Sequence, residues 1–132
     1  MDLVDSLFET ARAAQMNAYA PYSRFKVGAA VLSSSGVVYG GCNVENAAYP
    51  VGICAETAAI AAMVCAGANQ MSDILVFAEG DALVTPCGAC RQRIREFAGG
   101  DARIHIAGPE GVRRTFTVDD LLPYAFGPEN LA

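Results

Sequence analysis

The stretch CAETAAIAAMVCAG, residues 54–67, decides how this chain is layered. It consists almost entirely of strong helix formers and ends at Gly67, a residue type that commonly stops a helix. Beyond its first turn the helix is apolar nearly all the way round, so we expect it to be buried on several sides. The remaining segments must therefore supply layers that cover it.

The flanking segments alternate between strand patterns and helix patterns. Apolar residues at helical spacing from Leu3 to Ala18 predict an amphipathic helix that stops before Pro21. Apolar runs bounded by turn residues predict strands, and Pro86 and Gly99 mark the two ends of a third helix. This order predicts a mixed sheet covered by helices, an α/β sandwich. Two strands are expected within residues 25–41, around a turn at residues 34–36, and three more at residues 73–78, 103–108 and 115–118. Residues 41–53 are expected to form a loop. Residues 118–126 are expected to form a last helical turn or two, broken by Pro123.

The size and charge of the chain narrow the function classes. With 132 residues, it is expected to form one domain spanning residues 1–132. A net charge of −5 without runs of like charge argues against a nucleic-acid partner, because phosphates would be repelled. No segment is long enough to cross a bilayer, and Met1 leads into DLVDSLFE without a basic start, so we expect a cytoplasmic protein with no membrane partner. A hydrophobic content of 53% favours subunit contacts.

The cysteines point to a metal. Five of them, an odd number in an expected reducing compartment, favour metal binding or free thiols over disulfides. Cys87 and Cys90, in PCGACRQ, are three residues apart at a helix start, so their sulfurs share one face. Cys54 stands at the start of another expected helix, and the dipole at both starts favours thiolates. Three thiolates from two helix starts suit a shared Zn²⁺ site, one ion per chain, because zinc binds sulfur in tetrahedral geometry.

The fourth position of this site separates structural zinc from catalytic zinc. His105, the single histidine, lies in an alternating strand, which favours a structural place over ligation. Cys65 is eleven residues after Cys54, about three helical turns along the same helix, and is therefore too far away. Cys42, in the loop, stays open as a fourth ligand. Without it the site keeps a free position, which is typical of catalytic zinc.

Glu56 gives that free position a chemical use. Residues two apart on a helix do not face each other, so Glu56 is not expected to join Cys54 as a ligand. Its carboxylate can instead lean over the vacant position, hold a water molecule and move protons. The alternative is a first-turn glutamate that only complements the helix dipole. Beside three cysteines we favour the proton-transfer role.

These motifs together resemble the small, zinc-dependent, homotetrameric cytidine deaminases. CAE at residues 54–56 and PCGACRQ at residues 86–92 are similar to that family's two zinc motifs. PYSRFKVGAA, GCNVENAAYP and DLLPYAFGP extend the likeness over residues 21–128. Three cysteines with a nearby glutamate are a known variant of the zinc-deaminase signature. The resemblance implies a cytidine deaminase-like three-layer α/β/α sandwich with a mixed five-stranded sheet, and a homotetramer with active sites at subunit interfaces.

The resemblance also implies an activity and a set of residue roles. The reaction would be the hydrolysis of cytidine and 2′-deoxycytidine to uridine and 2′-deoxyuridine with release of ammonia, in pyrimidine salvage. Glu56 would carry protons to N3 of the base and to the departing amino group, while zinc activates water. The implied zinc ligands are Cys54, Cys87 and Cys90. The implied nucleoside contacts are Phe25 on the base, Ala55 through its backbone, and Asn43 and Glu45 at the 3′-hydroxyl. Tyr49 and Phe126 are implied to reach an adjacent subunit's site.

Several of these contacts have simpler alternatives. Asn43 and Glu45 are two apart in an extended segment, so both side chains point to one side and can together donate to and accept from one hydroxyl. Without the zinc motifs, a solvated loop would explain them equally well. Phe25 can equally be a core residue of a strand. For Tyr49 and Phe126 the alternative is simple interface packing.

Thr57 is a departure from the family pattern, which commonly has arginine after CAE. Three thiolates on Zn²⁺ leave a net charge of −1, and this makes the metal a poorer acid for its water. The usual arginine offsets the charge by donating to the sulfurs. Arg91, next to Cys90, is the nearest alternative donor, so we expect it to take over part of that role beside the helix N-termini.

Three other functions stay open from the sequence. The first is a deaminase of a related nucleoside or nucleoside antibiotic. The second is a non-catalytic zinc module whose fourth ligand is Cys42 or Cys65. The third is a redox dithiol formed by Cys87 and Cys90, in which Cys54 has no part.

Overall fold

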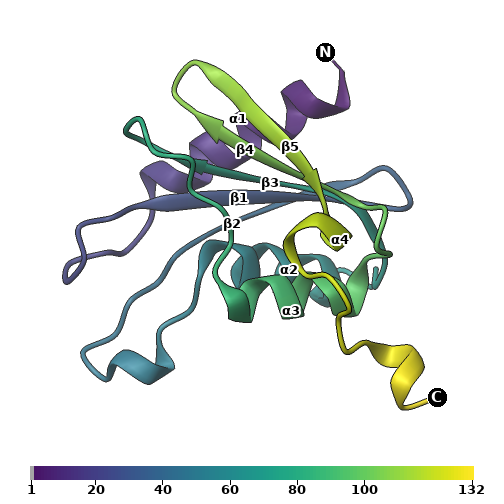
Figure 1. Ribbon diagram of the computed structural model, residues 1–132. Helices are drawn as coiled ribbons and strands as arrows, with labels where there is room; N and C mark the ends of the chain where they lie inside the picture. The colour runs from purple at the N-terminus through teal and green to yellow at the C-terminus, as the bar shows by residue number, and fades with distance from the viewer. Residues whose placement is uncertain (1) are drawn as a thin grey trace.

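A computed structural model describes residues 2–132 and shows one sheet between two layers of helices (Figure 1). The sheet has five strands in the order β2-β1-β3-β4-β5. The strands are β1 (Val27–Ser33), β2 (Val38–Cys42), β3 (Met71–Ala78), β4 (Arg103–Gly108) and β5 (Gly111–Thr117). The helices are α1 (Leu3–Met16), α2 (Ala55–Cys65), α3 (Gly88–Phe97) and α4 (Val118–Leu121), with short 3₁₀ turns at Tyr49–Val51 and Pro128–Asn130.

The sheet is mixed, as the sequence predicts. Strands β1 and β2 form an antiparallel hairpin, β1 also pairs antiparallel with β3, and β4 pairs antiparallel with β5. Only β3 and β4 run parallel. A parallel pair needs a crossover connection, and the chain between β3 and β4 contains α3.

Each face of the sheet has its own core. On one face, α1 places Leu7 and Ala11 against Leu75 and other residues of β1, β3 and β4. On the opposite face, α2 and α3 place Met63 and Ile94 against a second set that includes Ile74. Consecutive strand residues point to opposite faces and both faces are covered, which explains why residues 74–78 of β3 are all apolar. The predicted three-layer α/β/α sandwich is therefore confirmed.

Some element boundaries differ from the predictions. Strand β5 begins at Gly111, earlier than residue 115, and Val118 opens α4 instead of ending the strand. The cause is a capping box: the Thr117 side chain accepts from the backbone N–H of Asp120, while the Asp120 carboxylate accepts from the backbone N–H of Thr117. Pro86 precedes the N-cap of α3, which is Cys87.

Helix α2 is buried on one side only within a single chain. Ala55, Ala59 and Met63 are fully buried against the sheet, whereas Val64 and Cys65 are exposed. The expectation of burial on several sides is thus wrong for the isolated chain. At 11 residues α2 is short, and no helix within residues 2–132 is long and apolar enough to cross a bilayer.

Gly41 allows β2 to approach α2 closely. A Cβ atom at this position would lie 2.3 Å from the backbone nitrogen of Ala59 and 2.7 Å from the carbonyl carbon of Ala58. Both are helix backbone atoms, which cannot rotate out of the way as a side chain can. The contact fixes the distance between the hairpin and the helix that Cys54 begins.

The substitution Gly41→Ala should therefore destabilise the fold by about 3 kcal/mol or more, because the added methyl group forces β2 and α2 apart. Urea unfolding followed by circular dichroism would measure the loss. Gly88→Ala is the matched control, since a Cβ there meets open space, and it should change stability by no more than about 0.5 kcal/mol. Equal midpoints for the two variants would contradict the close approach.

Candidate metal centre and active site

Three cysteines meet where two helices begin. Cys54 is the N-cap of α2, Cys87 is the N-cap of α3, and Cys90 lies in the first turn of α3. Their sulfur atoms all lie within 4.8 Å of one another. Zinc–sulfur bonds of about 2.3 Å in tetrahedral geometry place sulfurs about 3.8 Å apart, so the donor set fits one zinc ion with only small adjustment.

The protonation energetics of the three thiols also favour a cation. Burial raises the pKa of Cys54 and of Cys90, and the charges of Glu56 and the neighbouring cysteines raise both further. For Cys87 partial burial raises the pKa, but hydrogen bonds from the backbone N–H groups of Cys90 and Ala89 and from the other two thiols outweigh it, and its pKa falls overall. Three thiolates cannot coexist here without a positive charge between them. A divalent ion supplies that charge.

The surroundings leave the fourth position without a cysteine or histidine. Within residues 2–132, Cys54, Cys87 and Cys90 are the only His, Cys, Asp or Glu side chains that cluster closely enough to hold a metal ion. His105 instead lies on β4, where Nε2 is 2.7 Å from Asp73 Oδ2 and Nδ1 is 2.9 Å from Thr115 Oγ1. This arrangement matches the structural place expected for His105. Neither Cys42 nor Cys65 belongs to the cluster, so a zinc module with either as fourth ligand is not formed.

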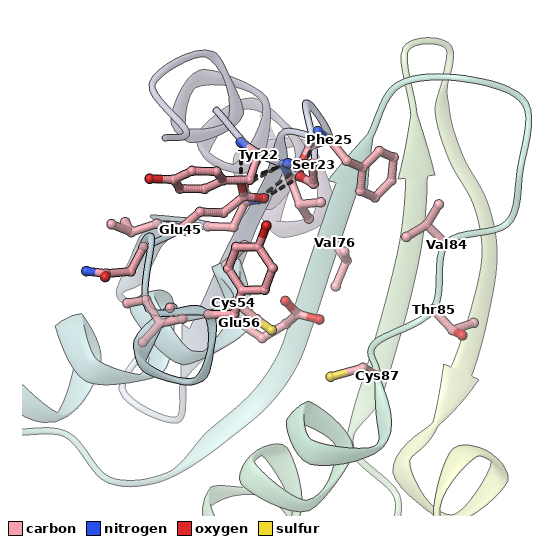
Figure 2. Close-up of a pocket in the computed structure, with 18 residues that line it drawn as sticks. Tyr22, Ser23, Phe25, Glu45, Cys54, Glu56, Val76, Val84, Thr85 and Cys87 are labelled. Atoms are coloured by element: carbon pink, nitrogen blue, oxygen red, sulfur yellow. Dashed lines mark hydrogen bonds between the residues drawn. The ribbon is translucent and has the colours of Figure 1, made fainter. Parts of the chain in front are cut away.

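Glu56 lies beside the sulfurs and is almost enclosed. Its exposed fraction is 5%. Figure 2 shows its carboxyl group pointing into the cavity next to the sulfurs of Cys54 and Cys87. Burial raises the pKa of this carboxyl, while its own backbone N–H and the positive charge of Arg93 act in the opposite direction. A carboxyl with a raised pKa is suited to accepting and releasing protons near neutral pH.

A cavity of about 620 Å³ opens from this corner to the surface. Its size is that of a small-molecule site. Five of the predicted substrate contacts line it together with Cys54, Glu56 and Cys87: Phe25, Asn43, Glu45, Tyr49 and Ala55. Phe126 is not among the lining residues; its carbonyl oxygen accepts a hydrogen bond from Gln92 Nε2 at 2.8 Å.

Similarity to known proteins agrees with this site. The family described as the cytidine and deoxycytidylate deaminase zinc-binding region matches residues 1–106. The chain belongs to this deaminase family. A cytidine deaminase of Sporosarcina psychrophila is 41% identical over 129 residues, which cover 98% of this chain and 95% of that protein. A cytidine deaminase of Halalkalibacterium halodurans is 40% identical, with 95% of each chain covered. The crystal structure of cytidine deaminase from Burkholderia pseudomallei has a TM-score of 0.87 at 42% identity, covering 92% of this chain and 98% of the other.

Asn43 and Glu45 both face the cavity of this deaminase-family chain, but each is already hydrogen bonded to the segment of residues 22–27. Asn43 Oδ1 accepts from the backbone N–H of Val27 and Nδ2 donates to the carbonyl of Phe25, both at 2.9 Å. Glu45 accepts from the backbone N–H groups of Tyr22 and Ser23. One N–H of the Asn43 amide is left for a ligand.

The lining residues that the sequence alone does not predict include three with hydroxyl groups: Tyr22, Ser23 and Thr85. Tyr22 and Ser23 belong to the PYSRF stretch, which forms part of the family resemblance. A polar side chain between two aromatic residues, just before a strand, was the available signal. Thr85 lies just before Pro86, in the loop that leads to Cys87 and Cys90.

Arg91 does not donate to the sulfurs, contrary to expectation. Its Nε donates to the carbonyl of Pro86 at 2.7 Å, Nη1 to the carbonyl of Leu121 at 2.9 Å and Nη2 to Thr85 Oγ1 at 3.0 Å. The guanidinium therefore ties the loop before Cys87 to α4. The prediction failed because oxygen acceptors at both sides satisfy all three nitrogens. Thr57 lies nearer to the metal centre, with Oγ1 4.0 Å from Cys90 Sγ.

Replacing Arg91 by alanine should raise the dissociation constant for Zn²⁺ about tenfold, because the loop that holds Cys87 loses two hydrogen bonds and its link to α4. Competition with a chromogenic zinc chelator would measure the change. Arg12→Ala is the control: Arg12 pairs with Glu9 on the surface of α1, and its replacement should leave zinc affinity unchanged. Equal affinities for the wild type and the Arg91 variant would contradict the anchoring role.

Proposed function

We propose that this protein catalyses the zinc-dependent hydrolytic deamination of cytidine and 2′-deoxycytidine to uridine and 2′-deoxyuridine, with release of ammonia. The observation that carries the proposal is the enclosed carboxyl of Glu56 beside a three-cysteine group that leaves one zinc position free. Family membership supports the same activity. Cys54, Cys87 and Cys90 are the proposed zinc ligands, with one ion per chain.

Glu56 is proposed as the group that moves protons. Zinc, when bound, supplies a Lewis acid that makes water acidic enough to attack near neutral pH. Glu56 takes a proton from the attacking water and gives it to N3 as the water oxygen bonds to C4 of the base. It then carries the second proton to the amino group at C4, which leaves as ammonia. One water is consumed, and one carbon–nitrogen bond is exchanged for a carbon–oxygen bond.

Lining residues of the cavity are proposed to contact the base and the 3′-hydroxyl of the nucleoside. Phe25, which is 44% exposed and lines the cavity, is proposed to pack on the base, and the buried Ala55 is proposed to meet the base through its backbone. Glu45 and the free N–H of Asn43 are proposed to accept from and donate to the 3′-hydroxyl. Because that hydroxyl is common to both nucleosides, the two substrates should be recognised alike at this position.

Exposed apolar residues and the state of the cysteines support the proposed oligomer and cellular context. A homotetramer with sites at the interfaces would cover exposed apolar residues around the cavity, with Tyr49 and Phe126 reaching an adjacent subunit's site. Within residues 2–132 none of the five cysteines forms a disulfide, which fits a reducing compartment and supports a cytoplasmic place in pyrimidine salvage. We also propose that residues 1–132 act as a single domain.

The decisive experiment combines metal analysis with an ultraviolet assay on cytidine. Purified protein should hold one Zn²⁺ per chain and convert cytidine with a falling absorbance. Glu56→Gln should keep its zinc but lower kcat at least about 100-fold, because the amide has the same shape and cannot carry protons. Glu9→Gln on the surface of α1 serves as control and should behave as wild type. A zinc-loaded wild type without turnover would refute the proposed function.

Phosphorylated substrates should be rejected. The residues that line the cavity include the two carboxylates Glu45 and Glu56 and no lysine or arginine, so a 5′-phosphate would find no positive partner there. We expect kcat/KM for CMP and dCMP to fall at least about 100-fold below the values for cytidine and deoxycytidine. Steady-state assays with the four compounds at equal ionic strength would test this. Comparable values for nucleoside and nucleotide would show that the cavity does not discriminate by charge.

A further inference from the structure

The segment of residues 22–27 carries Phe25 and depends on hydrogen bonds for its conformation. Tyr22 and Phe25 are about half exposed, so burial contributes little to holding them. Between them, Arg24 adopts a left-handed backbone with φ of 57°. A residue other than glycine in this region is uncommon and is held there by its surroundings. Asn43 and Glu45, in the segment after β2, make most of the hydrogen bonds that hold residues 22–27.

Ser23 joins the two halves of this arrangement through one hydroxyl group. Its Oγ donates to Glu45 Oε2 and accepts from the backbone N–H of Phe25 at 3.0 Å. The second bond spans Arg24 and braces its left-handed turn. The first bond joins the turn to the carboxylate that we place at the ribose. Figure 2 shows Ser23 between Glu45 and Phe25, with the bonds to Glu45 drawn as dashed lines.

The acceptor sites of Glu45 show why this hydroxyl matters for a ligand. Oε1 accepts from the backbone N–H groups of Tyr22 and Ser23, both at 3.0 Å, and these bonds occupy its two lone pairs. Oε2 accepts from the Ser23 hydroxyl and keeps one lone pair for another donor. The same hydrogen bonds, that from the Ser23 side chain first, hold the pKa of Glu45 below its ordinary value, so the group is a carboxylate at neutral pH. Only Oε2 is therefore available to a substrate hydroxyl.

We propose that Ser23 is a positioning residue: its hydroxyl aims Glu45 Oε2 at the 3′-hydroxyl of the nucleoside and fixes Phe25 over the base in the same step. This inference rests on the proposed function. Through Ser23, the hydrogen bond of Glu45 to the sugar and the packing of Phe25 on the base depend on each other, although Glu45 and Phe25 come from different segments of the chain.

A double comparison of enzyme and substrate tests the proposal. Wild type and Ser23→Ala, both loaded with zinc, are assayed with cytidine and with 3′-deoxycytidine. With cytidine, the variant should raise KM about tenfold while kcat changes less than about threefold, as expected for a lost hydrogen bond used in binding. With 3′-deoxycytidine, the loss in kcat/KM caused by Ser23→Ala should shrink to about twofold or threefold, because this substrate has no 3′-hydroxyl to donate to Oε2. The loss that remains with 3′-deoxycytidine comes from the weaker packing of Phe25 on the base.

Two further variants complete the design. Ser23→Thr keeps a hydroxyl at the same atom and should restore most of the affinity for cytidine. Ser34→Ala, an exposed serine in the turn between β1 and β2, should match the wild type. Equal penalties for both substrates, or a threonine variant as weak as the alanine variant, would overturn the inference while leaving the deaminase intact. A wild type that fails to convert cytidine would overturn the proposed function, and this inference with it.

Discussion

The mutual repulsion of three cysteine thiolates is the constraint on which this site depends. Their sulfurs lie within 4.8 Å of one another with the carboxyl of Glu56 beside them, so all three can be thiolates together only around a cation. Neither the segment before α2 nor the segment before α3 can hold the metal alone. The fold must therefore bring two helix starts together, and it does so by packing α2 and α3 on one face of the sheet.

The neighbourhood of the metal shows how that charge is managed without an arginine at position 57. Thr57 offers at most a weak contact to Cys90, and the guanidinium of Arg91 is used to hold a loop. What remains near the sulfurs is the backbone: N–H groups of Ala89 and Cys90 lower the pKa of Cys87. Neutral amides in fixed positions stabilise a thiolate without adding a charge that would also attract Glu56. This division leaves the carboxyl of Glu56 free to point into the cavity.

Much of the fold and the metal centre could be predicted because both depend on local patterns. Helix formers and turn residues marked α2, and the spacing of Cys87 and Cys90 placed their sulfurs on one face of α3. The Thr117–Asp120 capping box corresponds to T-x-x-D in the sequence, but the β-branched and aromatic residues of TFTV, residues 115–118, favour a strand through Val118. The partners of Arg91 and Ser23 had no such signal. Arg91 binds a carbonyl 30 residues away and Ser23 a carboxylate 22 residues away, so these contacts are set by how the loops meet after folding.

The cavity combines two environments that serve different steps. At its inner end Glu56 is 5% exposed, and the low polarity there raises the pKa of its carboxyl and strengthens each electrostatic contact. At its outer end Tyr22, Phe25 and Tyr49 are 48%, 44% and 72% exposed, so water reaches the place proposed for the sugar and the base. An apolar rim of this kind is costly to leave in water, and a hydrolysis that must exclude bulk solvent gains from covering it. In the proposed tetramer, one subunit contact would both bury the apolar rim and exclude bulk solvent from the site, because the rim itself would form the interface. The aromatic residues at the rim would then serve substrate binding and assembly together, and weakening the assembly would also open the inner end to water.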